Sequence, residues 1–206
     1  MPSVQKYLII AAVALTACNR KPHLPVQDGF EGATLSNLWD SSRFVKGAVK
    51  IQSKIVHSGH QAAMVTLKMG DKYEAGNDSS LVSERAELTE ARTLVSKEDN
   101  SYEYAFSMFI PADFPIVPTR LVIAQWKQYC KTEQCSDDSP VLALRYTSGI
   151  LQITIQTGAH REVFYETKDD LRNKWTSFKI QSDFSRTDNG FVKAWINGKS
   201  VLNYKG

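Results

Sequence analysis

The chain has 206 residues, of which 42% are hydrophobic and 23% are charged, and this is the composition of an ordinary globular protein. Its formal net charge of +3 is too small to indicate nucleic acid as a partner, and it suits an anionic ligand only where positive charge is gathered locally. A domain of roughly 180 residues buries enough apolar surface to fold without metal ions or disulfides. We therefore expect a leader followed by one domain that requires no cofactor.

An export signal is predicted at the N-terminus. Lys6 precedes an apolar run at residues 7–15 (YLIIAAVAL), which is too short to span a bilayer and has the length of a signal-peptide core. The run ends in LTAC, which resembles a bacterial lipobox, so Cys18 is the expected lipidated first residue of a cell-envelope lipoprotein at the outer membrane, facing the periplasm or the surface. A plain signal peptide and a buried N-terminal strand are the alternatives. The expected division of the chain is a signal peptide at 1–17, a tether at 18–27 and one domain at 28–206.

Two further cysteines lie close together in YCKTEQC. Export implies an oxidising compartment, so Cys130 and Cys135 are expected to close a small disulfide loop. Two free thiols on a polar loop are the alternative. A metal site is not predicted there, because neither histidine nor a second cysteine pair lies nearby in the sequence.

Short strands dominate the sequence after residue 28. Apolar and polar residues alternate along SYEYAFSMFI (101–110) and ILQITIQT (150–157), so each segment is predicted to bury one face of a strand. Asn197-Gly198 is the strongest hairpin signal, because both residues readily take the positive φ of a type I′ turn. Helix signals are weak, and KDDLRNKW (168–175) is expected to hold a turn or two. Further strands are expected at 63–69, 121–129, 141–146, 175–184 and 191–204.

This many short strands at near-regular spacing predicts an all-β fold, a β-jelly roll or concanavalin-like sandwich of two sheets. Several of the strands oppose an apolar face with a face of Gln, Thr, Arg and Lys. In a curved sandwich such polar faces combine into a concave groove. A groove of this kind suits an extended polar ligand such as a glycan.

The strand LVIAQWKQY (121–129) has a partly polar face in an otherwise apolar run. Strict alternation directs Val122, Ala124 and Trp126 to the core, and it directs Ile123, Gln125, Lys127 and Tyr129 to the other face. The polar residues of that second face either meet solvent or line a groove and hold an anionic group. In the second case Gln125 and Lys127 would be the donors to that group.

Residues 83–90 (SERAELTE) provide the second candidate stretch. Arg85 and Glu87 stand two apart on one face, roughly 6–7 Å between Cα atoms, and are close enough to pair. A paired arginine is held in place and offers its remaining donors to a carboxylate in fork geometry. A structural ion pair on a solvated sheet is the alternative. Glu84 and Glu87 alternate to opposite faces, so this segment cannot supply the two carboxylates of a glycoside hydrolase.

SERAEL, followed by AQWKQ, PVLALRY and FVKAWINGKSVLNYKG, resembles the polysaccharide lyases of the heparin lyase I and glucuronan lyase type over nearly all of residues 28–206. These enzymes are β-jelly rolls, and the resemblance implies cleavage of an acidic glycan by β-elimination beside a uronic acid. Arg85 and Gln125 would neutralise the uronate carboxylate, so that the C5 proton can be removed. A base must reach that proton, and an acid must lie near the leaving C4 oxygen.

The sequence departs from the family pattern in two places. The family usually has His two residues after the Gln, where this chain has Lys127, which is then expected as the base or as a further carboxylate contact. The family also carries a catalytic Tyr on a later strand, whereas this chain ends in NYKG, and Tyr204 belongs to the preceding hairpin. The domain is therefore expected to be incomplete at its C-terminus.

Further substrate contacts are expected from Glu87, Tyr129, Arg145 and Lys193, with a plain surface position as the alternative for Arg145. Trp195 shares a strand face with Lys193, and it either stacks on a sugar ring or packs inside the sandwich. The expected partner is an anionic polysaccharide, bound by a monomer.

His57 and His60 are alternative bases, although positions in a surface loop suit them better. Asp28 and Glu31 could hold a structural calcium ion, but one acidic pair without its other ligands is weak support for a metal site. The rival functions are a non-catalytic glycan-binding module on the same scaffold and a structural envelope lipoprotein without a ligand.

Overall fold

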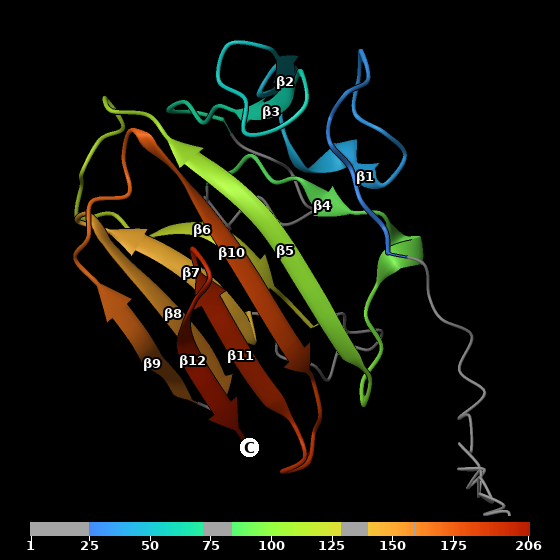
Figure 1. Ribbon diagram of the computed structural model, residues 1–206, viewed down its shortest axis with the longest axis vertical. Coiled ribbons are helices and arrows are strands. Elements are labelled where there is room, and N and C mark those ends of the chain that lie inside the picture. Colours follow the sequence, from blue (N-terminus) through green and yellow to red (C-terminus); the bar gives the residue numbers. More distant parts are fainter. Residues whose placement is uncertain (1–24, 72–83, 129–139, 159) are drawn as a thin grey trace, which may run out of the picture.

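The computed structural model describes residues 25–71, 84–128, 140–158 and 160–206, and within these ranges the fold is all-β. Two four-stranded antiparallel sheets pack face to face, and two short ribbons lie at one end of them (Figure 1). The front sheet, nearest the viewer in Figure 1, has the strand order β12-β11-β10-β5, and the rear sheet has the order β6-β7-β8-β9. The predicted two-sheet jelly roll is confirmed.

The front sheet consists of β5 (Ser101–Ile110), β10 (Lys174–Asp183), β11 (Phe191–Ile196) and β12 (Lys199–Lys205). The rear sheet consists of β6 (Leu121–Trp126), β7 (Leu142–Thr147), β8 (Ile150–Thr157) and β9 (His160–Thr167). The ribbons pair β1 (Trp39–Asp40) with β4 (Thr89–Glu90) and β2 (Val49–Gln52) with β3 (Ala62–Val65). The described helices are two 3-10 turns, η1 (Ser41–Arg43) and η2 (Arg92–Leu94), so no helix in the described ranges could cross a membrane.

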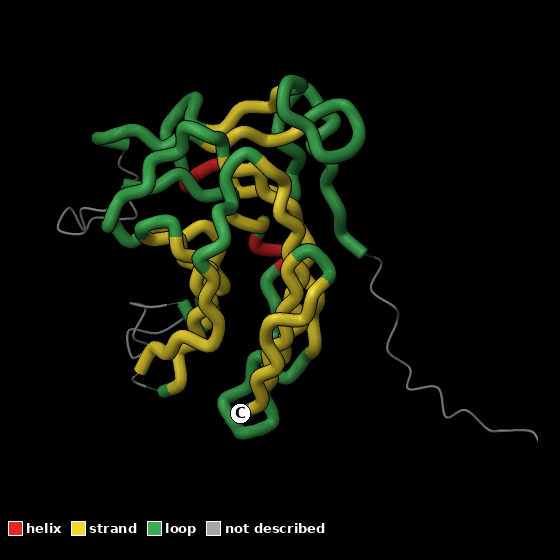
Figure 2. The backbone as a smooth tube through the Cα atoms, turned by 60° about the vertical axis from the view of Figure 1, so that its left-hand side comes forward, coloured by secondary structure: helices red, strands yellow, loops and turns green. Residues whose placement is uncertain are grey.

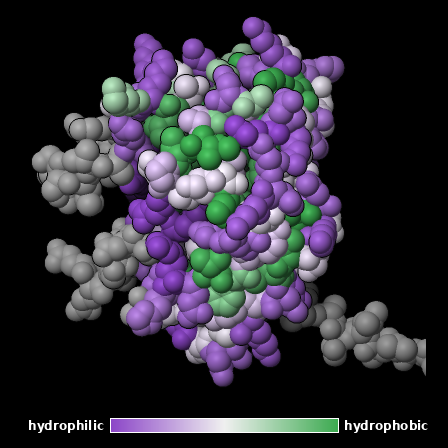
Figure 3. All heavy atoms as spheres, turned by 90° about the vertical axis from the view of Figure 1, so that its left-hand side faces the viewer, coloured by the Kyte–Doolittle hydropathy of each residue, from purple (hydrophilic) through white to green (hydrophobic). Residues whose placement is uncertain are grey.

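The core lies between the two sheets, which Figure 2 shows as separate layers seen nearly edge-on. Each long strand turns every second residue inward, and β10 alternates between buried and partly exposed positions along almost its whole length. The predicted inward rows of residues 101–110 and 150–157 are confirmed, since Phe106 and Met108 pack against the core and Leu151 and Ile153 are fully buried. The side of the molecule in Figure 3 is mostly hydrophilic, with scattered hydrophobic patches.

Two tight turns fix the register of neighbouring strands. Asn197 and Gly198 have φ values of 50° and 78°, and they join β11 to β12 as the sequence predicted. Ser148 and Gly149, with φ values of 52° and 79°, join β7 to β8 in the same way. Positive φ at both central residues is the requirement of a type I′ turn, whose twist matches that of the strands.

The predicted alternation of β6 is wrong in its first half. The register of β6 against β7 shifts between Val122 and Ala124, which is a β-bulge. Val122 therefore lies opposite Arg145 on the outward face, and Ile123, Ala124 and Trp126 pack against the core. The bulge lets an extra apolar side chain reach the core, and a period of two cannot reveal it.

The expected helical turn in residues 168–175 is also wrong. Asp170 accepts hydrogen bonds from the backbone N–H of Arg172 at 2.9 Å and from its Nε at 3.0 Å. Asn173 then takes a φ of 58°, and Leu171 is buried, with an exposed fraction of 5%. When an aspartate side chain accepts a hydrogen bond from the backbone N–H two residues later, this local hydrogen bond competes with helix formation.

Candidate active site

Three of the predicted site residues meet in the structure. Glu87 Oε1 accepts a hydrogen bond from Gln125 Nε2 at 3.2 Å and lies 3.7 Å from Arg85 Nη1. The predicted proximity of Arg85 and Glu87 is thus confirmed, and Gln125 reaches the same carboxylate oxygen from a different strand. We call these three side chains the Arg-Glu-Gln cluster.

The backbone holds the arginine side of the cluster in an extended conformation. Arg85 N–H donates to the Asp71 carbonyl at 3.1 Å, and Glu87 N–H donates to the Arg43 carbonyl at 3.1 Å. The chain then enters β4, which pairs with β1. These long-range contacts fix where the side chains of Arg85 and Glu87 project, although residues 85–88 themselves belong to no sheet.

The rear sheet supplies the amide side of the cluster. Gln125 lies opposite Ala143, whose neighbours Leu142 and Leu144 are both fully buried in the core. Because paired residues of antiparallel strands project to the same side, Gln125 points away from the core on the outward face of the rear sheet. The cluster therefore lies outside the packed interior.

The cluster is open to solvent. Arg85 and Glu87 have side-chain exposed fractions of 34% and 27%, and Gln125 is exposed. A guanidinium carries five N–H donors and an amide carries two. A cation and a neutral donor that converge in this way can bind a carboxylate and stabilise negative charge that develops on it.

Arg145 lies on the same outward face, opposite Val122, and only 4% of it is exposed. Its Nε donates to Thr154 Oγ1 at 3.0 Å. Burial, reinforced by the charges of Arg161 and Arg120, lowers the pKa of Arg145 to about 10, so the guanidinium is still charged at neutral pH. Within the part of the chain that the structure describes, no carboxylate lies within 4.0 Å of it. The rear sheet thus carries a nearly buried cation that no carboxylate of the described residues balances.

Two comparisons with known proteins give a match to this chain. The family model described as "Polysaccharide lyase" matches residues 30–206. The chain belongs to the polysaccharide lyase family. Among solved structures, this chain resembles the crystal structure of endo-beta-1,4-glucuronan lyase from the fungus Trichoderma reesei, with a TM-score of 0.61 and 17% identity. The match covers 81% of this chain and 70% of that one. No curated protein gives a significant match.

The structure describes only some of the other predicted site residues. Lys127 follows directly after β6, two residues beyond Gln125, and is exposed. Tyr129 and the proposed disulfide pair Cys130 and Cys135 lie outside the described residues, as does Cys18. The assignments of these four residues remain predictions.

Lys193 and Trp195 do not join the Arg-Glu-Gln cluster. Both lie on β11 of the front sheet, on the face that points away from the core. The cluster lies with the rear sheet, so a substrate contact by Lys193 at the cluster is not supported. Trp195 does not pack inside the sandwich, which was the alternative expected from the sequence.

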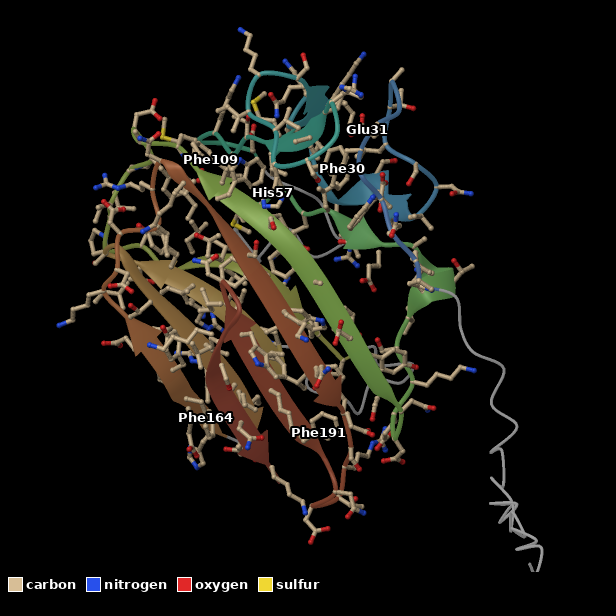
Figure 4. All side chains as sticks on the ribbon, viewed as in Figure 1. Phe30, Glu31, His57, Phe109, Phe164 and Phe191 are labelled. Carbon is tan, nitrogen blue, oxygen red and sulfur yellow. The ribbon has the colours of Figure 1, made fainter. Side chains whose placement is uncertain are left out.

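The alternative bases and the calcium candidates lie near the ribbons at the upper end of the fold. The ring of His57 packs edge-on against Trp175, with ring centroids 5.1 Å apart, and it lies near Phe109 over β5 (Figure 4). Glu31 accepts hydrogen bonds from the backbone N–H groups of His60 and Gln61. These histidines are therefore part of a surface loop and not of the cluster.

Asp28 and Glu31 are engaged with the protein itself. Asp28 accepts hydrogen bonds from the N–H of Phe30 at 2.7 Å, from the Ser36 hydroxyl at 2.7 Å and from Trp39 Nε1 at 2.8 Å. In the described ranges no group of three or more His, Cys, Asp and Glu side chains is placed to hold a metal ion. Through these hydrogen bonds the two carboxylates hold the loops near β1 in place.

The sequence did not predict three residues that influence Arg145. Thr154 is 2% exposed and accepts the Nε hydrogen bond, while Arg161 and Arg120 add positive charge nearby. The only signal for Thr154 was its place on the polar face of ILQITIQT. Arg120 and Arg161 lie in segments whose sequence gives no indication that they approach β7.

Proposed function

We propose that this polysaccharide lyase cleaves a uronate-containing glycan by β-elimination, with Arg85 and Gln125 bound to the uronate carboxylate. The observation that carries the proposal is the convergence of both side chains on one Glu87 oxygen, in an exposed position outside the core. Membership of the lyase family and the fold shared with a glucuronan lyase support the reaction class.

The reaction needs charge neutralisation first. The C5 proton of a uronate is weakly acidic while the carboxylate beside it is charged, and donors on that carboxylate stabilise the negative charge that builds up there. A base then takes the C5 proton, the bond between C4 and its glycosidic oxygen breaks, a C4–C5 double bond forms, and the leaving oxygen receives a proton. No oxidant or reductant is consumed in this step.

Glu87 acts in this proposal as a positioning residue. Its carboxylate would repel the carboxylate of a uronate, so direct binding of substrate is unfavourable. Its contacts with Arg85 and Gln125 instead hold both donors in one geometry before substrate arrives. This role replaces the substrate contact that the sequence suggested for Glu87.

Arg145 is proposed to take the acidic group of a neighbouring sugar. It lies on the same outward face as Gln125, it is nearly buried, and its charge is unbalanced within the described residues. A bound carboxylate would supply the missing anion through charge-assisted hydrogen bonds. Glucuronan is the first polymer to test, because the structural neighbour is a glucuronan lyase.

Lys127 is proposed as the base. A lysine accepts a proton only as the neutral amine. Lys127→His introduces the residue that the family usually carries at this position, and it should retain activity that Lys127→Ala loses. Lys127→Ala with undiminished activity would remove Lys127 from the mechanism.

The decisive experiment is ultraviolet absorbance of the unsaturated uronate product during digestion of glucuronan, alginate, heparin and hyaluronan. Arg85→Ala and Gln125→Ala should each lower kcat by about 10²–10³-fold, the usual cost of removing one donor from developing charge. Wild-type rates in both variants would refute the assignment. Binding of a glycan without product from any of the four polymers would favour the non-catalytic binding module.

Export and lipidation at Cys18 belong to the same proposal and rest on the N-terminal sequence. A lipoprotein of the cell envelope would meet the polysaccharide outside the cytoplasm. Metabolic labelling with a fatty acid should mark the wild type and not Cys18→Ala. Equal labelling of both proteins would exclude Cys18 as the acceptor.

A further inference from the structure

The outward face of the front sheet carries aromatic and cationic side chains far from the Arg-Glu-Gln cluster. The pairing register places Lys179 opposite Trp195, and places Lys193 opposite Gln181 in the next outward row. The front sheet turns this face towards the viewer in Figure 1, and no other strand crosses its lower part. Phe191 and Trp195 are partly exposed on this face.

A shallow hollow of about 350 Å³ lies in this face. Three small side chains, Ala105, Ser107 and Ser177, form part of its lining, and the Ser107 and Ser177 hydroxyls lie 2.8 Å apart. Trp195 and Lys179 also line it. We call the hollow together with Lys193 the front-sheet platform.

The cations of the platform are held against aromatic rings. Lys179 Nζ lies 4.6 Å from the ring centroid of Trp195, and Lys193 Nζ lies 5.4 Å from that of Phe191, at the lower end of β11 in Figure 4. Lys179 also lies 3.7 Å from Glu103, whereas no carboxylate lies within 4.0 Å of Lys193 among the described residues. The rings fix the directions of the ammonium groups and neutralise them only weakly.

These features together match an acidic sugar. A pyranose ring fits over a floor of small side chains, its hydroxyls pair with serine hydroxyls, and its carboxylate pairs with an ammonium group. A hollow of this size holds one or two sugar units. The open, polar lining is unsuited to an apolar ligand, and the two ammonium groups disfavour a cation.

We propose that the front-sheet platform is a second, non-catalytic binding site for the acidic polysaccharide. The chemical class of the polymer rests on the proposed function, but the site itself does not. It lies on the other outward face of the sandwich, so only a long chain that wraps the domain, or a second chain, can occupy it together with the cluster. Such a site raises the affinity for long polymers through effective concentration, without a change in the chemical step.

The test uses the double variant Lys179→Ala/Lys193→Ala, with Lys50→Ala as the matched control. Lys50 is an exposed lysine on β2, away from the front sheet. Retardation of each protein in native gels containing glucuronan or alginate measures polymer binding. Two exposed charge contacts removed together should weaken binding about three- to tenfold, and Lys50→Ala should bind as the wild type does. Cleavage of short oligouronates should be unchanged in all three proteins.

Each outcome bears on the platform separately from the lyase. Loss of polymer binding in the double variant supports the platform, even if no protein cleaves any glycan. Equal retardation of the wild type and the double variant overturns it, even if cleavage is normal. If Lys50→Ala weakens polymer binding by the same factor, binding depends on the overall charge of the protein and not on a site, and the platform proposal is overturned. Complete loss of retardation in Gln125→Ala shows a single site at the cluster and also overturns it.

A second measurement excludes an effect of folding and a different partner. Thermal unfolding of the double variant should stay within a few degrees of the wild type, because both lysines are surface residues. Vesicles with anionic lipid headgroups serve as the competing surface. Retention of vesicles, but not of glucuronan or alginate, by the wild type and its loss in the double variant would overturn a glycan site.

Discussion

The positioning role of Glu87 gives the sharpest test of the candidate site. Glu87→Gln removes the negative charge but keeps an oxygen that can accept from Gln125, whereas Glu87→Ala removes both. The ion pair and the hydrogen bond involve side chains that are 27–34% exposed or more, so their loss should cost less than about 1 kcal/mol of folding stability. Any large change in rate therefore reflects geometry and not unfolding.

Two effects of Glu87→Gln oppose each other. A substrate carboxylate at about 6 Å from Glu87 would feel a repulsion of about 0.7 kcal/mol in a water-like medium and about 2.8 kcal/mol at an effective dielectric constant of 20. Neutralisation removes this repulsion and lowers KM. Loss of the ion pair loosens Arg85, and misplacement of about 1 Å costs up to about 10²-fold in rate.

We therefore expect a split between the two kinetic constants. Glu87→Gln should show a lower or unchanged KM with kcat reduced about tenfold, and Glu87→Ala should lose about 10²-fold in kcat. Initial rates from product absorbance, measured over a range of polymer concentrations, give both constants. Glu98→Gln is the control, since Glu98 forms an ion pair with Arg186 elsewhere on the surface and should leave both constants unchanged. A full kcat with a lower KM in Glu87→Gln would refute the positioning role, and a rise in KM alone would restore the substrate contact.

The remaining predictions concern stability and metal dependence. Arg145→Met should raise folding stability by about 1–3 kcal/mol in urea unfolding and should also raise KM, because it removes a nearly buried charge that lacks a carboxylate partner within the described residues. The pKa of Arg145 is lowered in the folded state, so above about pH 10 the unfolded wild type binds more protons than the folded wild type. The stability of the wild type therefore rises with pH in that range, and the difference in stability between Arg145→Met and the wild type should become smaller. Leu144→Ala, at a fully buried position, should cost about 2–5 kcal/mol. Gly198→Ala should cost about 1–2 kcal/mol through its φ of 78° alone, because no atom lies within 4 Å of an added Cβ. Chelation should leave activity unchanged, since Asp28 and Glu31 are bound by protein donors; a loss restored by calcium would contradict this.

The strands were predictable because burial imposes a period of two. The inward residues of β5, β7 and β8 follow directly from alternation, and both type I′ turns carry residues that tolerate positive φ. The contact between Arg85 and Glu87 was predictable for the same reason, since two residues on one face are neighbours.

Contacts between distant segments were not predictable in this way. Gln125 and Glu87 are 38 residues apart, and within the sequence only the resemblance to known lyases links their segments. The burial of Arg145 depends on side chains from other segments, such as Thr154, which local alternation does not report. The placement of Lys193 on the front sheet depends on which sheet β11 joins, and its own residues do not encode that choice.

The rear sheet departs from the expected pattern at two neighbouring positions, with a bulge in β6 and a nearly buried arginine in β7. The bulge at Ile123 lets three apolar residues of β6 reach the core while Gln125 stays outward, and it sets Val122 against Arg145. Bulges commonly re-aim side chains beside active sites, and a cation with 4% exposure that no described carboxylate balances is unfavourable for stability alone. Both departures become understandable if an anion completes the site from outside. Binding of oligouronate should then raise the unfolding temperature of the wild type more than that of Arg145→Met, because a bound carboxylate pairs with the charge of Arg145, which the variant lacks.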